Sequence, residues 1–175
     1  MKSRIVVFAL VSVIGVALAA SVIVLGQRRA FSPTFSDLIA AAHLDEVAAE
    51  VTDQNFPSPG PVAPMSSMRI FSPQELGWDL TAAEIAVALD RLGYRPANLR
   101  ELLVWAQTWK GLELVFAIGS SRPEGSGDNR YDSYPFLYDS EKGWVPGGQY
   151  RRLLSIGISP SYRWGWPWLF LAVRK

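Results

Sequence analysis

The sequence of 175 residues contains no cysteine and only one histidine. Without cysteine the chain forms no disulfide bond and offers neither a thiol nucleophile nor a cysteine ligand for zinc. The histidine, His43, lies in a segment expected to be a solvated helix, and a Ser-His-Asp triad would require it to reach across a proline-rich stretch. A phosphate-binding loop is also missing, because Gly125-Ser126-Gly127 has no lysine and no helix after it. We therefore expect neither nucleophilic nor nucleotide chemistry.

Carboxylates are the remaining candidates for catalysis or metal binding. Five of them fall in segments expected to be loops or strand ends: Glu124, Asp128, Asp132, Asp139 and Glu141. Paired carboxylates can hydrolyse glycosides or hold calcium, but Asp128-Asn129 matches no calcium-loop spacing, and exposed acids between strands usually only solvate a loop. The sequence favours a protein that is not an enzyme and uses no metal and no cofactor. A cell-wall hydrolase built on two of these acids, such as Asp128 and Asp132, is an alternative.

Charge is absent from residues 5–26, and a helix of that length, at ~1.5 Å per residue, reaches about 33 Å, which is enough to cross a bilayer core. We interpret residues 1–29 as an uncleaved signal anchor, because the apolar run exceeds the roughly 7–15 residues of a cleavable signal core. The alternative is cleavage near Ala19 and secretion. The flanking positive charges slightly favour a cytoplasmic N-terminus, which places the rest of the chain outside the cytoplasm.

Lysine and arginine are absent between Ala30 and Met68, where five acids occur. Helical spacing of the apolar residues predicts a helix over residues 31–52, so residues 30–52 are expected to form an acidic helical stalk. Residues 53–67 contain four prolines and predict a linker without packed structure. The domain proper would then cover residues 68–175. Its 13 basic and 11 acidic residues nearly balance, which argues against nucleic acid as a partner.

Two capping boxes give the strongest local signals in this domain. Thr81 with Glu84 predicts a helix over residues 82–92, and Asn98 with Glu101 predicts one over residues 99–109. Strands are expected at residues 68–71, 112–118, 131–138, 144–145, 151–158 and 168–174. Two helices followed by a series of strands predict an α+β domain with a mostly antiparallel sheet.

Aromatic residues gather near the C-terminus: Tyr162, Trp164, Trp166, Trp168 and Phe170. Gly165 and Pro167 interrupt a regular strand there, which predicts a loop over residues 159–167 and a final strand from Trp168. Such rings either fill a small core or form a binding surface of rigid aromatic groups with adaptable polar neighbours. Both interpretations stay open, and the loop position favours the binding surface.

Two short stretches resemble a known family. The stretch Gly93-Tyr-Arg-Pro-Ala-Asn-Leu-Arg-Glu-Leu-Leu103 and the ending Phe170-Leu-Ala-Val-Arg174 resemble motifs of small bacterial C-type-lectin-like domains, including targets of diversity-generating retroelements. The resemblance covers about residues 69–175. It implies a lectin-like fold whose variable, ligand-facing residues precede the last strand; with Trp168 added, these are Ser159, Ser161, Tyr162, Arg163, Trp164, Trp166 and Trp168. The sequence lacks the Glu-Pro-Asn and Trp-Asn-Asp motifs of calcium-dependent sugar binding.

Together these observations predict a membrane-anchored, non-catalytic protein that recognises an extracellular protein or glycan through the aromatic loop. The alternative is a small accessory subunit of a cell-envelope complex, whose transmembrane helix docks through a weak stripe of small residues at Ser12, Gly15 and Ala19.

Overall fold

The computed structural model describes residues 33–58, 60–109, 114–141 and 149–175. Residues 5–26, where the sequence predicts a membrane anchor, lie outside these ranges. Within them, none of the helices combines the length and the apolar character that crossing a membrane requires. Residues 33–175 form one compact unit.

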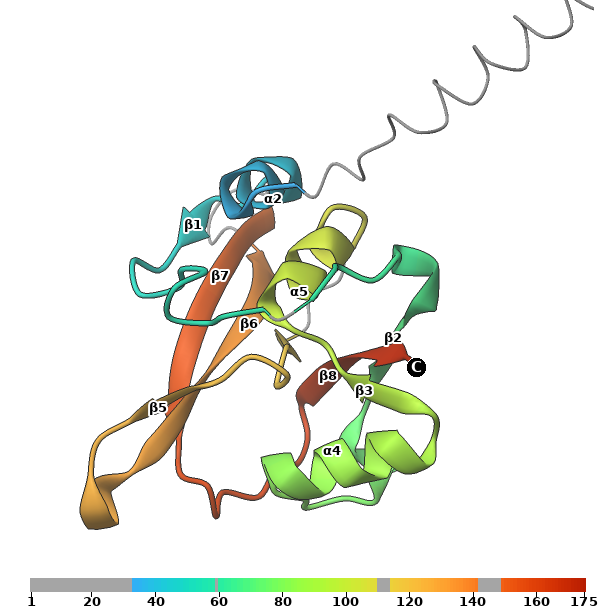
Figure 1. The fold of residues 1–175 in the computed structure, drawn as a ribbon, viewed down its shortest axis with the longest axis vertical. Coiled ribbons are helices and arrows are strands. Elements are labelled where there is room, and N and C mark those ends of the chain that lie inside the picture. The colour runs from blue at the N-terminus through green and yellow to red at the C-terminus, as the bar shows by residue number, and fades with distance from the viewer. Residues whose placement is uncertain (1–32, 59, 110–113, 142–148) are drawn as a thin grey trace, which may run out of the picture. The chain divides into compact units, whose positions relative to one another are not determined.

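The predicted α+β class is confirmed. The described strands form a mostly antiparallel, open sheet in the order β1-β7-β6-β4-β8-β2, with β3 pairing with β8 and β5 with β6 (Figure 1). Only β1 with β7 and β4 with β8 run parallel. The bounds are β1 (Glu46–Val47), β2 (Met68–Phe71), β3 (Tyr94–Pro96), β4 (Leu114–Phe116), β5 (Arg122–Glu124), β6 (Tyr131–Glu141), β7 (Gln149–Ile158) and β8 (Trp168–Arg174).

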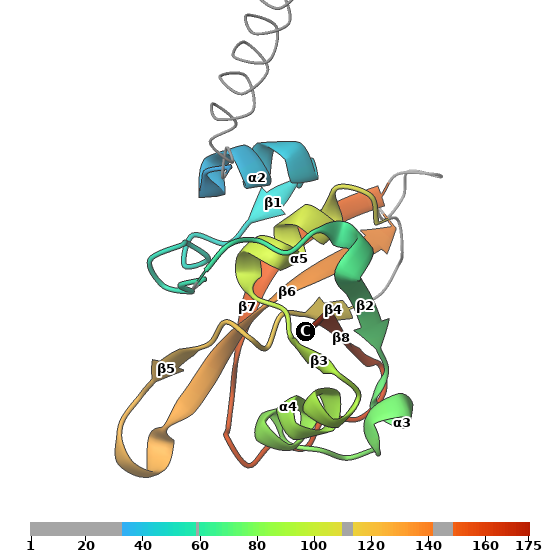
Figure 2. The ribbon, with the colours of Figure 1, turned by 45° about the vertical axis from the view of Figure 1, so that its right-hand side comes forward.

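Four α-helices accompany the sheet in the described ranges: α2 (Phe35–Ala42), α3 (Pro73–Leu76), α4 (Ala82–Arg91) and α5 (Leu99–Ala106). Both predicted capping boxes are confirmed, since Thr81 and Asn98 accept hydrogen bonds from the backbone N–H groups of Glu84 and Glu101. Figures 1 and 2 show α2 with β1 at one end of the domain and α4 at the opposite end. The α5 helix ends at Ala106, three residues earlier than predicted.

The sheet separates two apolar clusters because successive side chains of a strand point to opposite faces. Val115 and Leu171 join the cluster that α2 and α5 cover, whereas Phe116 and Phe170 join the cluster that α4 covers. The loop after β7 contributes Trp164 to the second cluster. The loop with the predicted binding residues is therefore attached to the α4 side of the sheet.

The predicted stalk and linker belong to the folded domain instead of preceding it. The first helix ends at Ala42, not at residue 52, and β1 then pairs with β7. Val51 and Phe56 are buried in the same cluster as the helix α5. Burial of these apolar side chains favours a packed segment over a solvated stalk. The compact unit accordingly begins at Pro33.

Two arginines fasten this N-terminal segment. The guanidinium of Arg151 on β7 donates to the carbonyl oxygens of Ala42 and Trp109, at 2.9 and 3.2 Å, and so binds the chain at the ends of α2 and α5. The guanidinium of Arg100 on α5 forms a two-point ion pair with Asp53, whose pKa it lowers by hydrogen bonding. Arg100 thus neutralises Asp53, the first residue of the segment that the sequence predicts to be a linker.

A fully buried carboxylate connects three parts of the domain. Glu101, with 0% side-chain exposure, accepts hydrogen bonds from the backbone N–H groups of Ala63 and Asn98 and from both terminal nitrogens of Arg95. Hydrogen bonding to this carboxylate raises the pKa of Arg95. A substitution of Glu101 would deprive all of these donors of their partner. We therefore expect it to lower the stability of the fold more than a substitution of any other capping-box acid.

We predict that Glu101→Gln lowers the free energy of unfolding by about 3 kcal/mol, because the amide leaves Arg95 and two backbone donors imperfectly paired. The matched control is Glu84→Gln at the same position of the α4 capping box, where the side chain is 50% exposed and a clearly smaller loss is expected. Urea denaturation of the full-length protein measures both. Equal losses in the two variants would contradict this role of Glu101.

Candidate functional site

The loop over residues 159–167 is held against the start of α4 by its backbone and by one arginine. The N–H of Trp164 donates to the carbonyl oxygen of Leu80 at 2.8 Å, and this contact forms an isolated β-bridge. The side chain of Arg163 lies 3.0 Å from Asp79 and 3.8 Å from Glu84. The predicted final strand does begin at Trp168. The loop is therefore fixed in place by α4 and its preceding turn.

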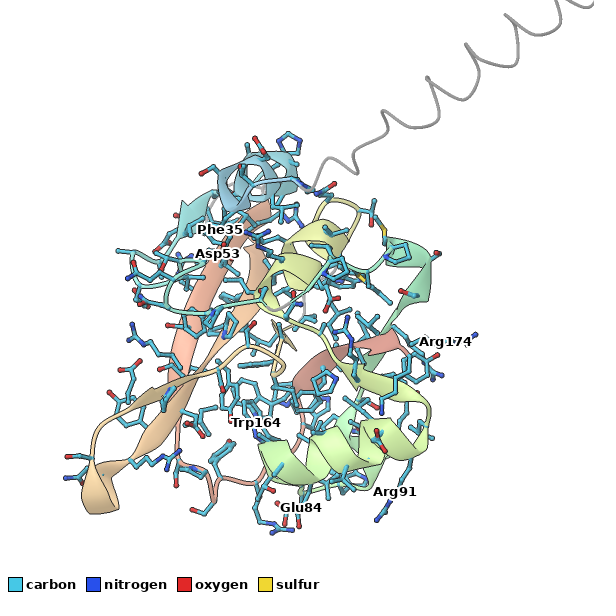
Figure 3. All side chains as sticks on the ribbon, in the orientation of Figure 1. Phe35, Asp53, Glu84, Arg91, Trp164 and Arg174 are labelled. Carbon is cyan, nitrogen blue, oxygen red and sulfur yellow. The ribbon has the colours of Figure 1, made fainter. Side chains whose placement is uncertain are left out.

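Trp164 belongs to the core, which corrects the expectation that its ring faces a ligand. Its side chain is 1% exposed and packs against the rings of Phe116, Tyr134 and Phe170 at centroid distances of 4.9, 5.8 and 5.5 Å. Figure 3 shows Trp164 inside the domain and Glu84 on the outer side of α4. The indole N–H has no hydrogen-bond partner among the described residues. Burying about 150–250 Å² of ring at ~25 cal/mol per Å² contributes about 4–6 kcal/mol, which exceeds the roughly 1–3 kcal/mol that such a donor costs.

The other predicted site residues differ in their exposure and in their contacts. Trp166 is 76% exposed and Tyr162 is 42% exposed, so both rings are accessible. The hydroxyls of Ser159 and Ser161 lie 2.9 Å apart and bond to each other. Arg163 is engaged with the acids of the α4 turn. Of the predicted set, only Trp166 and Trp168 line the same cavity.

That cavity, which we name the aromatic groove, has a volume of about 550 Å³. It is lined by Ser72, Pro73, Gln74, Leu114, Tyr138, Trp166, Pro167, Trp168 and Leu169. Of these residues, the sequence predicted only Trp166 and Trp168 as part of the site. The sequence gives no signal that joins them, because the groove forms only when β2 and β4 pair on either side of β8 and so bring residues 72–74 and Leu114 beside the loop.

Trp168 forms the link between the groove and the core. Its ring contacts those of Phe116 and Trp164 at centroid distances of 5.3 and 5.8 Å, both in edge-on geometry. The same side chain also lines the groove. Because its neighbours in the core are closely packed, Trp168 is a rigid part of the groove wall, whereas Trp166 extends into solvent.

The polar side chains of the groove are uncharged, and most of them make no hydrogen bond among the described residues. Within the described part of the chain, no hydrogen bond engages the side chains of Gln74, Tyr138, Trp166 or Trp168. The Ser72 hydroxyl, in contrast, donates to Glu75 at 3.2 Å. Among the described residues that line the groove there is no Lys, Arg, Asp or Glu. A ligand would therefore meet aromatic faces together with neutral hydrogen-bonding groups.

A second, smaller cavity lies between α3 and α4. It has a volume of about 380 Å³ and is lined by Leu76, Leu80, Ala83, Glu84, Val87, Ala88 and Arg91. Val87 is 51% exposed, and the nearby Trp78 in the turn between the helices is 52% exposed. The described lining of this α3–α4 groove combines apolar side chains with two charged residues, Glu84 and Arg91.

Of the five acids considered for catalysis, the structure describes the side chains of Glu124 and Asp132. Glu124 on β5 accepts hydrogen bonds from Ser133 and Tyr131 of β6 at 2.6 and 2.9 Å and pairs with Arg122 on its own strand. These donors lower its pKa to about 2, so it is ionised at neutral pH and is unsuited to donate a proton. The side chains of Asp128, Asp139 and Glu141 lie outside the described part. Among the residues described, no three His, Asp or Glu side chains gather in a way that could hold a metal ion.

Comparison with protein-family models finds no family that matches the chain. Comparison with curated proteins and with solved structures finds no match either. The site is therefore assessed on its own geometry.

The first prediction from this site separates the two tryptophans of the loop. Trp164→Ala should lower the free energy of unfolding by about 3–5 kcal/mol, because it leaves a cavity among packed rings. Trp166→Ala should change it by less than about 0.5 kcal/mol, because the side chain is mostly in solvent. Thermal and urea unfolding of the full-length variants measure both. A Trp164 variant as stable as the wild type would contradict the burial of this ring.

The second prediction concerns pH. Because the folded-state pKa of Glu124 is lowered from its ordinary 4.5 to about 2, the stability it contributes is complete above about pH 4.5 and is lost as the pH falls through about 2. The stability difference between the wild type and Glu124→Gln should be constant near neutral pH and shrink below about pH 4. NMR titration of the Glu124 carboxyl gives the independent check. A midpoint near 4.5 would contradict the hydrogen bonds of the hairpin.

Proposed function

We propose that this protein is a non-catalytic recognition protein of the cell envelope that binds its ligand in the aromatic groove. The observation that carries this proposal is Trp166, a large apolar ring that is 76% exposed at the rim of a cavity lined by neutral polar and aromatic side chains among the described residues. Exposed tryptophan is costly to keep in water and is enriched where proteins bind. The groove volume falls within the roughly 300–1,000 Å³ typical of ligand sites.

The groove favours binding over catalysis. Catalysis needs a group that can gain or lose a proton near neutral pH, or a nucleophile with a base beside it. Among the described residues that line the groove, Tyr138 alone has a titratable side chain. We accordingly assign the groove to recognition, with Trp166 as the accessible anchor and Trp168 as the fixed wall.

The finer assignment to the C-type-lectin-like group is part of this proposal. Its support is the stretch from Gly93 to Leu103, which forms β3 and most of α5, and the ending Phe170 to Arg174, which lies in the central strand β8. The membrane anchor over residues 5–26, with the domain outside the cytoplasm, is likewise proposed from the sequence.

The test uses purified full-length protein on arrays of glycans and peptides. We predict a ligand whose signal falls at least about tenfold in Trp166→Ala, a size typical for the loss of an aromatic anchor. The matched control is Trp78→Ala, which removes another half-exposed tryptophan outside the groove and should leave the signal unchanged. The absence of any array signal, or a signal that Trp166→Ala leaves intact, would contradict the proposal.

The α3–α4 groove supports the second candidate, a docking surface for a partner subunit. Its apolar wall includes Val87, which is 51% exposed, and apolar surface of this kind often marks protein interfaces. In this case, a stoichiometric partner that co-purifies in mild detergent should be lost in Val87→Glu and retained in Trp166→Ala. The opposite pattern would assign the interaction to the aromatic groove.

A further inference from the structure

We infer that this protein has a separate binding site for a small carboxylate, in a cavity beside the start of α5. This α5 cavity has a volume of about 490 Å³ and is lined by Pro61, Arg95, Pro96, Asn98 and Gly119. It shares none of these residues with the aromatic groove. The inference therefore does not depend on the function proposed for that groove.

The guanidinium of Arg95 has one occupied edge and one open edge. Nη1 and Nη2 donate to the two oxygens of Glu101 at 2.8 and 2.5 Å, and Nη1 also donates to the carbonyl oxygen of Pro96 at 3.2 Å. Within the described part of the chain, no hydrogen bond engages the Nε–H or the second N–H of Nη2. Arg95 lines the cavity with a side chain that is 40% exposed, whereas Glu101 does not line it. Because guanidinium binds carboxylates through two parallel N–H bonds, the open edge can hold a second carboxylate.

A buried amide without a partner provides further donors in the same cavity. Asn98 is only 5% exposed, and its Oδ1 accepts a hydrogen bond from the N–H of Glu101 at 3.0 Å. Its Nδ2 has no hydrogen-bond partner among the described residues. A buried N–H group without a partner costs free energy, and an oxygen of a bound ligand would remove that cost. Asn98 therefore favours a ligand that presents hydrogen-bond acceptors.

The charges around the cavity favour an anion with a single charge. Arg95 is the one charged side chain among the described residues that line it, and the positive end of the α5 helix begins at Asn98. The buried carboxylate of Glu101 already pairs with Arg95, so a dianion such as phosphate would meet stronger repulsion than a carboxylate.

The walls of the cavity limit the rest of the ligand. The rings of Pro61 and Pro96 are apolar, and they are the described side chains that line the cavity besides Arg95 and Asn98. The volume lies within the roughly 300–1,000 Å³ typical of small-molecule sites. The ligand is therefore a small monocarboxylate whose remaining part is apolar.

The experiment follows the Asn98 side-chain amide and the Gly119 backbone N–H in ¹⁵N NMR spectra of the full-length protein. Sodium isobutyrate is added at constant ionic strength, and we expect saturable shifts of both signals with a Kd of about 10 mM or lower. Isobutyramide has nearly the same shape but no charge, and it should bind at least about tenfold more weakly. Phosphate should also bind more weakly than isobutyrate.

Asn98→Ser keeps a capping oxygen for α5 and removes the amide donor, so it should weaken isobutyrate binding at least about fivefold at the Gly119 signal. The matched control is Thr81→Ser, which changes the capping residue of α4, lies outside the lining of the cavity and should bind as the wild type does.

Three outcomes on the wild-type protein would overturn the inference: no saturable shift with isobutyrate, equal binding of isobutyramide, or tighter binding of phosphate. These comparisons need no variant, so they decide the question even if Asn98→Ser fails to fold. Isobutyrate binding that Asn98→Ser leaves unchanged in a folded protein would also contradict the site. None of these results bears on the aromatic groove, which is tested separately through Trp166.

Discussion

The buried carboxylate of Glu101 is the interaction on which the arrangement of this domain depends most. It receives donors from β3, from the start of α5 and from the N-terminal segment at Ala63, and so fixes three parts of the chain at one point. A buried charge is tolerated only where such donors surround it. The same arrangement that closes a capping box therefore also determines where residues 60–67 lie.

The chain is closely packed around the start of α5, next to Glu101, and this packing limits which residues fit there. A Cβ atom at Gly119 would lie 2.7 Å from the carbonyl oxygen of Ala97, so only glycine fits beneath the start of α5. The next residue, Ser120, accepts a hydrogen bond from the N–H of Leu99 at 3.0 Å. The backbone thus approaches α5 closely enough for β4 and the loop after it to support the helix. Arg95, Asn98 and Glu101 are joined by hydrogen bonds. These bonds give a physical reason for the residue types in the stretch from Gly93 to Leu103, on which the family resemblance rests.

Local features could be predicted from the sequence, whereas contacts between distant segments could not. The boxes at Thr81 and Asn98 lie within four residues of chain, and the strand from Trp168 follows a proline, so both were accessible to pattern reasoning. The burial of Val51 and Phe56 depends on α5, which follows more than forty residues later. Their segment is acidic and proline-rich, and composition alone indicated a stalk and linker. Two apolar residues in a polar segment were the only signal of a packed region.

Contacts between distant segments also explain why Trp164 and Trp166 of the aromatic loop differ in burial, although the sequence pattern treats them alike. Alternation along an extended chain would place Trp164 and Trp166 on one face, but the chain between them is not a regular strand. Trp164 is drawn inward by the bridge to Leu80, which places its ring over Phe116 and Phe170. Beyond this bridge the described elements give less cover, because α3 spans only Pro73–Leu76 and its first two residues, with Ser72, line a groove instead of a packed interface. Among the described residues a wall lies beside Trp166 and no helix or strand packs over its ring, which is the structural reason for its 76% exposure.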